Sequence, residues 1–116
     1  MKLVVFFLSA LLLFPGVTGA LKEARSLRAQ SNLRQVGLVL HEYAREHGGR
    51  LPDAIEELVE EGYLSKEMFK QLKADNYKYK AAGKSLRRLK SDDTLIYMPD
   101  LGLRLCADGN IKSEKK

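Results

Sequence analysis

Residues 31–52 read Ser-Asn-Leu-Arg-Gln-Val-Gly-Leu-Val-Leu-His-Glu-Tyr-Ala-Arg-Glu-His-Gly-Gly-Arg-Leu-Pro, a stretch that predicts one amphipathic helix and the point where it ends. Apolar residues recur every three or four positions, which places them on one buried stripe of an α-helix. With one residue from upstream, the stripe is Ala29, Leu33, Val36, Leu40, Tyr43 and Ala44. Gly48 can adopt the left-handed conformation that closes a helix, and Pro52 disfavours a helical residue before it. We therefore expect the helix to end near His47.

Two short helices are expected within residues 52–72, after the long helix. Pro52 suits the first turn of a helix, and Gly62 closes the short apolar pattern that follows it. Ser65 can cap the next helix, because its hydroxyl group accepts a hydrogen bond from a backbone N–H group. The apolar residues of these segments are expected to turn back toward the core.

Residues 77–113 change from a helical period to an alternation of apolar and polar side chains, which indicates strands. Asp108 and Gly109 both tolerate positive φ, so they predict a two-residue hairpin turn. The expected fold class is α+β. A long helix over residues 21–47 packs on a small antiparallel sheet, and the short helices lie between them in the sequence.

Four sequence elements follow one another in a recognisable order. An Asn-Leu-Arg-Gln-Val-Gly motif, a Tyr near the helix end and a Gly-Arg-Leu-Pro break are carried by Asn32, Leu33, Arg34, Gln35, Val36, Gly37, Tyr43, Gly49, Arg50, Leu51 and Pro52. Residues 53–64 follow with an apolar helix that Gly62 ends, and residues 93–97 and 105–111 add a strand pair with the Asp-Gly turn. Across most of residues 15–111 this order resembles the globular part of type IV pilin-like proteins and the pseudopilins of type II secretion systems.

The resemblance implies a non-enzymatic structural or assembly protein of the cell envelope that acts through protein–protein contacts. In pilin-like filaments the N-terminal helices pack together in a central bundle. Four apolar residues lie outside the main stripe and are therefore expected to meet a partner: Leu21, Ala24, Leu27 and Leu38. The expected partners are other envelope or pilin-like proteins, including further copies of this chain. Two alternatives stay open, namely a free periplasmic or secreted binding module with a pilin-like head, and a minor pilin that contacts DNA.

The chain departs from the family in two places. Pilin-like precursors carry a short basic leader, a Gly-Phe cleavage point and a Glu early in a long apolar helix, and residues 1–14 contain none of these features. Many of them also carry a His in a Gly-rich loop before the final hairpin, where residues 98–102 here read Met-Pro-Asp-Leu-Gly. Neither prepilin processing nor the role of that His is therefore carried over to this chain.

Residues 1–20 fit the three regions of a secretory signal peptide. Lys2 is basic, residues 3–14 are apolar, and small residues precede a cleavage point after Ala20. A membrane-spanning helix needs roughly 20 apolar residues, so this run is short for an anchor. The alternative is a shortened pilin-type helix that is retained in the inner membrane. Both interpretations predict that residues 21–116 form one exported domain, either periplasmic or secreted.

No catalytic, cofactor or metal site is predicted. His41 and His47 are six residues apart, which places them on different helix faces rather than at the i, i+4 spacing of a paired metal site. The sequence lacks a nucleophile elbow, a His-Glu-x-x-His motif and a Gly-rich phosphate loop, so it does not favour an enzyme. Cys106 is the only cysteine and is expected to be a buried strand thiol. Four acidic residues near the sheet do not follow a recognised calcium-loop spacing: Asp92, Asp93, Asp100 and Asp108.

Positive charge is concentrated in the linker between two predicted strands. The whole chain has a net charge of +5, and four of its basic residues lie close together: Lys84, Arg87, Arg88 and Lys90. Such a patch can contact phosphate groups in DNA or in lipid head groups. The interleaved Leu86 and Leu89 instead favour a solvated basic loop that packs on the domain. Nucleic acid is thus not favoured as a partner, and a membrane is expected only if residues 3–14 are retained.

Overall fold

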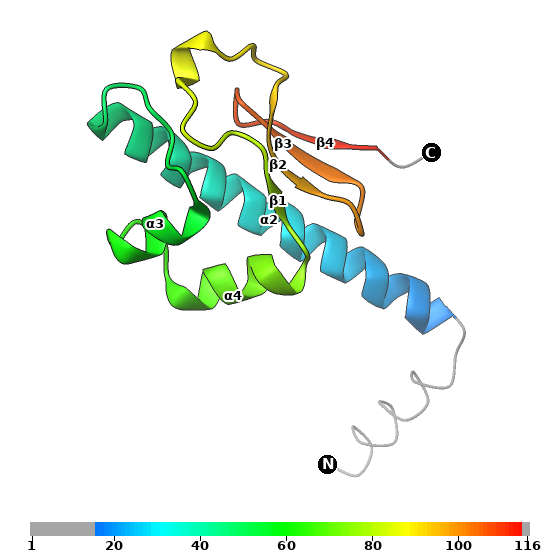
Figure 1. Cartoon of the computed structure of the whole chain (residues 1–116). Coiled ribbons are helices and arrows are strands. Elements are labelled where there is room, and N and C mark those ends of the chain that lie inside the picture. Colours follow the sequence, from blue (N-terminus) through cyan, green and yellow to red (C-terminus); the bar gives the residue numbers. More distant parts are fainter. Residues whose placement is uncertain (1–15, 115–116) are drawn as a thin grey trace.

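The computed structural model describes residues 16–114, with side chains described from Leu21 onward. A long helix crosses one face of a small antiparallel sheet, and two short helices lie on the other side of that helix from the C-terminal strands (Figure 1). The α+β class expected from the sequence is confirmed. Residues 1–15, which hold most of the expected leader, lie outside the described residues.

The long helix, α2, runs over Gly16–Glu46. It begins before the expected first residue Leu21, so the expected cleavage point after Ala20 falls within its backbone, and it ends one residue before His47. The predicted apolar stripe is buried in full: Ala29, Leu33, Val36, Leu40, Tyr43 and Ala44. Among the described residues, no helix has both the length and the apolar composition needed to cross a membrane.

The end of α2 is closed by glycine, as the sequence predicts. Gly48 has a φ of +67°, and the N–H group of Gly49 donates to the carbonyl oxygen of Ala44 at 2.6 Å. Left-handed backbone of this kind is costly for side chains with a Cβ atom, which explains the Gly-Gly pair. The chain then turns sharply, so that Leu51 and Pro52 become buried.

Two short helices follow, α3 over Ile55–Glu60 and α4 over Lys66–Ala74. Gly62 ends the first segment with a φ of +82°. The hydroxyl oxygen of Ser65 accepts a hydrogen bond from the Met68 N–H group at 3.1 Å, which confirms the predicted cap. Helix α4 continues two residues beyond the expected boundary at residue 72.

The sheet is a meander of four antiparallel strands in the order β1-β2-β3-β4. Its strands are β1 (Lys78–Tyr79), β2 (Thr94–Met98), β3 (Leu103–Cys106) and β4 (Ile111–Ser113). An irregularity in the β2–β3 register lies between Thr94 and Ile96, which breaks the strict alternation of side chains. Two consecutive residues, Leu95 and Ile96, are therefore both buried.

The Asp-Gly turn joins β3 to β4, but its geometry differs from the expected two-residue turn. Gly109 has a φ of +90°, whereas Asp108 has no positive φ. The Cys106 N–H group donates to the Asn110 carbonyl oxygen at 2.8 Å, so the turn is longer. Asp108 stabilises it through its side chain, since Oδ1 accepts from the Asn110 N–H group at 2.9 Å.

Helix α2 lies close to strand β3. A Cβ atom at Gly37 would lie 3.2 Å from Leu105 Cδ1, so the absence of a side chain at Gly37 allows this close approach. One turn further along, His41 Nε2 donates to the Ala107 carbonyl oxygen at 2.8 Å. The helix is thereby held against both the strand and the turn that follows it.

Candidate functional site

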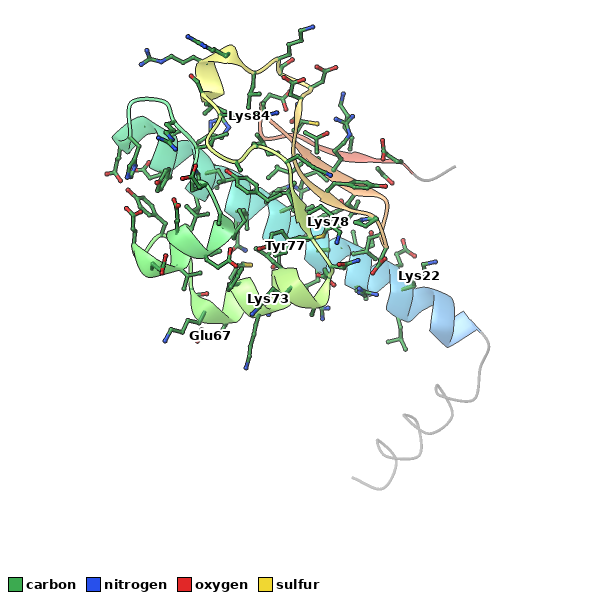
Figure 2. All side chains as sticks on the ribbon, viewed as in Figure 1. Lys22, Glu67, Lys73, Tyr77, Lys78 and Lys84 are labelled. Atoms are coloured by element: carbon green, nitrogen blue, oxygen red, sulfur yellow. The ribbon has the colours of Figure 1, made fainter. Side chains whose placement is uncertain are left out.

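Helix α2 carries the largest exposed apolar side chains of the described residues. Leu21, Leu27 and Leu38 are 62%, 59% and 74% exposed, and Ala24 is also exposed. Residues 21–24 are exposed at every position, because α2 extends beyond the domain before Arg25 and Ser26 make the first contacts. Figure 2 shows Lys22 on this projecting part of the helix.

Leu27 and Leu38 are separated by eleven residues, which is close to three helical turns. Both therefore lie on the same face of α2, roughly 16 Å apart along its axis. The four residues that the sequence singled out as possible partner contacts are thus all accessible. Leu21 is six residues from Leu27 and therefore lies on a different side of the helix. Single exposed leucines are common on protein surfaces, but a pair on one helix face is suited to packing against a partner.

The C-terminal part of this face opens into a groove of about 560 Å³ between α2 and the loop that contains η1 (Leu86–Arg88). Leu38, Ala44 and Leu86 contribute the apolar part of its lining. The remaining lining residues are polar or small: His41, Glu42, Arg45, Gly49 and Arg87. Leu38 and Arg87, which the sequence placed in separate features, are therefore brought together in one groove.

Backbone hydrogen bonds fix the η1 loop beside the end of α2. The Leu86 N–H group donates to the Gly49 carbonyl oxygen at 2.7 Å, and the Leu51 N–H group donates to the Lys84 carbonyl oxygen at 2.9 Å. The side chain of Arg87 passes close to Gly49, where an added Cβ atom would lie 3.5 Å from Arg87 Nε. The wall of the groove is thus built by the backbone rather than by a mobile side chain.

The predicted basic patch is exposed at all four positions: Lys84, Arg87, Arg88 and Lys90. None of these side chains has a carboxylate within ion-pair distance among residues 16–114. Leu86 and Leu89 are half-buried and pack against the core, as expected for a basic loop that lies on the domain. Figure 2 shows Lys84 where this loop meets the body of the molecule. Only Arg87 of the four lines the groove.

On the helix side of the groove the positive and negative side chains are paired, whereas on the loop side the positive charge has no acidic partner among the described residues. Arg45 forms an ion pair with Glu42, the one acidic residue in the lining. His41 is engaged by the Ala107 carbonyl oxygen. Arg87 has no such acidic partner among the described residues, so it gives this edge of the groove a net positive charge.

The other polar residues at this end of α2 hold the fold together. His47 stacks on Tyr43 with ring centroids 3.7 Å apart, and its Nδ1 atom donates to the Tyr43 carbonyl oxygen. Its Nε2 atom lies 3.5 Å from Glu61 Oε1.

Burial, together with the charges of Glu61 and Glu57, raises the pKa of the Tyr43 phenol. A hydrogen bond to Glu46 raises the pKa of Tyr63 to about 12. Both phenols are therefore neutral hydrogen-bond donors near neutral pH.

The remaining candidate residues are dispersed. His41 and His47 contact different partners, as their spacing predicts, and among residues 16–114 no group of three or more His, Cys, Asp or Glu side chains could hold a metal ion. Asp93 accepts from the Lys90 N–H group and Asp108 holds the hairpin turn. Cys106 is a fully buried free thiol, as expected. The described residues thus offer a surface for binding.

No protein-family model matches the chain, and neither the curated proteins nor the solved structures contain a match to it.

Proposed function

We propose that this protein is a non-enzymatic, exported structural or assembly protein of the cell envelope, similar to pilins and pseudopilins, that acts through protein–protein contacts. The observation that supports this function best is the pair of exposed leucines, Leu27 and Leu38, on the outward face of α2. An exposed leucine costs free energy in water, which is recovered when a partner covers it. The sequence motifs of residues 32–64 and 93–111 supply the family resemblance.

A second candidate is a free periplasmic or secreted binding module that kept the pilin-like head. The groove between α2 and the η1 loop favours this alternative, because it is concave and can accept a segment of another molecule. Both candidates use the same outward face of α2. They differ in whether the protein is part of an envelope assembly or acts as a free binding module.

Replacing Leu38 by Glu tests the shared surface. Leu38 is 74% exposed, so the variant is expected to fold with an unchanged unfolding midpoint. It is also expected to lose co-purification with solubilised envelope proteins, because a charge would be forced into an apolar interface. Ala82, an exposed residue outside this face, supplies the matched control Ala82→Glu, which is expected to keep its partners. Retained partners in Leu38→Glu would contradict the proposed surface.

Mass spectrometry of the mature N-terminus tests whether residues 1–20 are removed as a signal peptide or retained as an anchor. We expect a chain that begins at Leu21, because small residues and a short apolar run precede that position. Intact Met1 in a carbonate-resistant membrane fraction would contradict the signal peptide and favour the anchored, pilin-like alternative.

A further inference from the structure

The groove beside Leu38 combines an apolar floor with a positively charged edge. Leu38 and Leu86 come from two elements that are far apart in the sequence, and Ala44 lies between them on the helix. Arg87 stands at the edge without an acidic partner among the described residues. A ligand that fills this groove must therefore offer both an apolar group and a negative charge.

The charge around the groove is one-sided beyond its lining residues. Residues 84–90 contain four basic side chains and no acidic one. All four are exposed, so they create a positive potential over the opening of the groove. Negatively charged segments are attracted to such a surface, and positively charged segments are repelled from it.

The dimensions suit a short peptide segment. On α2 the lining runs from Leu38 to Arg45, seven residues along the helix, and Gly49 lies just past the helix end. Seven residues of helix extend roughly 10 Å, which matches about three residues of extended chain. The groove is open along its length, so a segment can enter from the side.

Other parts of this chain do not complement the groove. In a second copy, Leu21 and Leu27 are accompanied by three basic residues and one carboxylate, Glu23, so this segment has a net positive charge that the positive edge would repel. Helix α3 is acidic, but its Ile55 and Leu58 are buried and its Val59 is partly buried in the core. Residues 111–116 carry three lysines and one glutamate. Residues 3–14 are apolar and carry no acidic side chain.

We propose that this groove binds a short segment of a different protein, in which an apolar side chain is flanked by carboxylates. The apolar side chain packs on Leu38 and Leu86, and the carboxylates face Arg87 and the rest of the basic loop. The proposal rests on the proposed function, since it names the partner chemistry for the C-terminal half of the same helix face. It goes beyond that function because it excludes another copy of this chain as the occupant of the groove.

Selection from a phage-displayed library of random dodecapeptides on the immobilised full-length protein tests this chemistry. The enriched sequences are expected to place Asp or Glu next to Leu, Ile, Phe or Met. A fluorescent synthetic copy of the most enriched peptide then serves as the probe in polarisation measurements. Leu38→Glu and Arg87→Glu are each expected to weaken its binding by at least about tenfold.

Arg88→Glu is the matched control, because Arg88 is exposed in the same loop but does not line the groove. It changes the charge of the protein by the same amount as Arg87→Glu, and we expect it to weaken binding by less than about threefold. Circular dichroism and unfolding midpoints of the three variants establish that each remains folded.

Three outcomes would overturn the proposal. The first is a selection that enriches no peptides, or only basic and uncharged ones. The second is an acidic peptide whose binding Leu38→Glu leaves unchanged. The third is an equal loss in Arg87→Glu and Arg88→Glu, which would show general charge attraction to the loop. The proposed function is tested separately by co-purification: envelope partners that are retained in Leu38→Glu would contradict it, whatever the peptide selection yields.

Discussion

Helix α2 has two kinds of contact with the rest of the domain, one apolar and one polar. Against the sheet it packs through its buried stripe and approaches β3 closely at Gly37. Against α4 it forms two polar pairs. Arg25 Nε donates to Asp75 Oδ1 at 3.0 Å, and Asn32 Nδ2 donates to Gln71 Oε1 at 2.8 Å.

The apolar and polar contacts of α2 contribute differently: the apolar contact mainly stabilises the domain, and the polar contact mainly fixes the position of α4 along α2. Apolar burial is non-directional and roughly proportional to area, so the buried stripe contributes more to the free energy of folding than the two polar pairs do. Hydrogen bonds and ion pairs require one geometry and contribute less net free energy. The contact with α4 therefore fixes where along α2 the short helix lies.

Of the variants that test these two contacts, Leu40→Ala is expected to lower the free energy of unfolding most. Leu40 is fully buried in the stripe that faces the core, and truncation leaves a cavity that the close packing cannot fill. The free energy of unfolding should fall by about 2–5 kcal/mol, measured by urea denaturation. A loss below about 0.5 kcal/mol would show that the stripe is not the stabilising contact.

Arg25→Ala should have the next largest effect and tests the polar contact. Asp75 is only 2% exposed, and its Oδ2 atom has no hydrogen-bond partner among the described residues, so removal of Arg25 leaves a buried carboxylate unpaired. We expect a loss of about 2–3 kcal/mol in the free energy of unfolding.

The reciprocal variant Asp75→Ala is the control for this pair. The side chain of Arg25 is 41% exposed, so water can solvate the guanidinium group once its partner is gone. The expected loss is about 1 kcal/mol, clearly smaller than for Arg25→Ala. Equal losses in the two variants would contradict the idea that Asp75 is buried while Arg25 can be solvated.

Substitutions at Gly37 measure how closely α2 approaches β3, and Gly37→Ala should have the smallest effect of these variants. Alanine gains about 1 kcal/mol of helix propensity but places its Cβ atom 3.2 Å from Leu105 Cδ1, at the flexible end of a side chain. Gly37→Ala should therefore change the free energy of unfolding by less than about 1 kcal/mol. Gly37→Val adds two further methyl groups and should cost about 1–3 kcal/mol. A Val variant as stable as Gly37→Ala would contradict the close approach.

The fold could be predicted well wherever local rules act. Periodicity identified the buried stripe of α2, the Gly-Gly pair marked its end, and Ser65 marked the start of α4. The Asp-Gly turn was located correctly, but its geometry was wrong, because Asp108 uses its side chain rather than a left-handed backbone. The close approach at Gly37 left no signal of its own, since it depends on β3.

The candidate groove could not be predicted from the sequence alone. Leu38 was identified because it lies off the stripe, and Arg87 because it lies in a basic run. Their sequence positions are 49 residues apart, and no local pattern links them. Leu86 was expected to pack on the domain, without any indication that it shares a concave surface with Leu38 and Arg87.

By itself, the sequence determined which face of α2 is buried, where α2 ends and where α4 begins, because these depend on periodicity, glycine conformation and capping within a few residues. Only the tertiary structure decided that the η1 loop lies beside the end of α2, where the Leu86 N–H group reaches the Gly49 carbonyl oxygen. It also decided that Arg25 pairs with Asp75. The physical reason is that contacts between distant residues depend on how whole elements pack, and packing is set by shape and by buried polar groups across the entire domain.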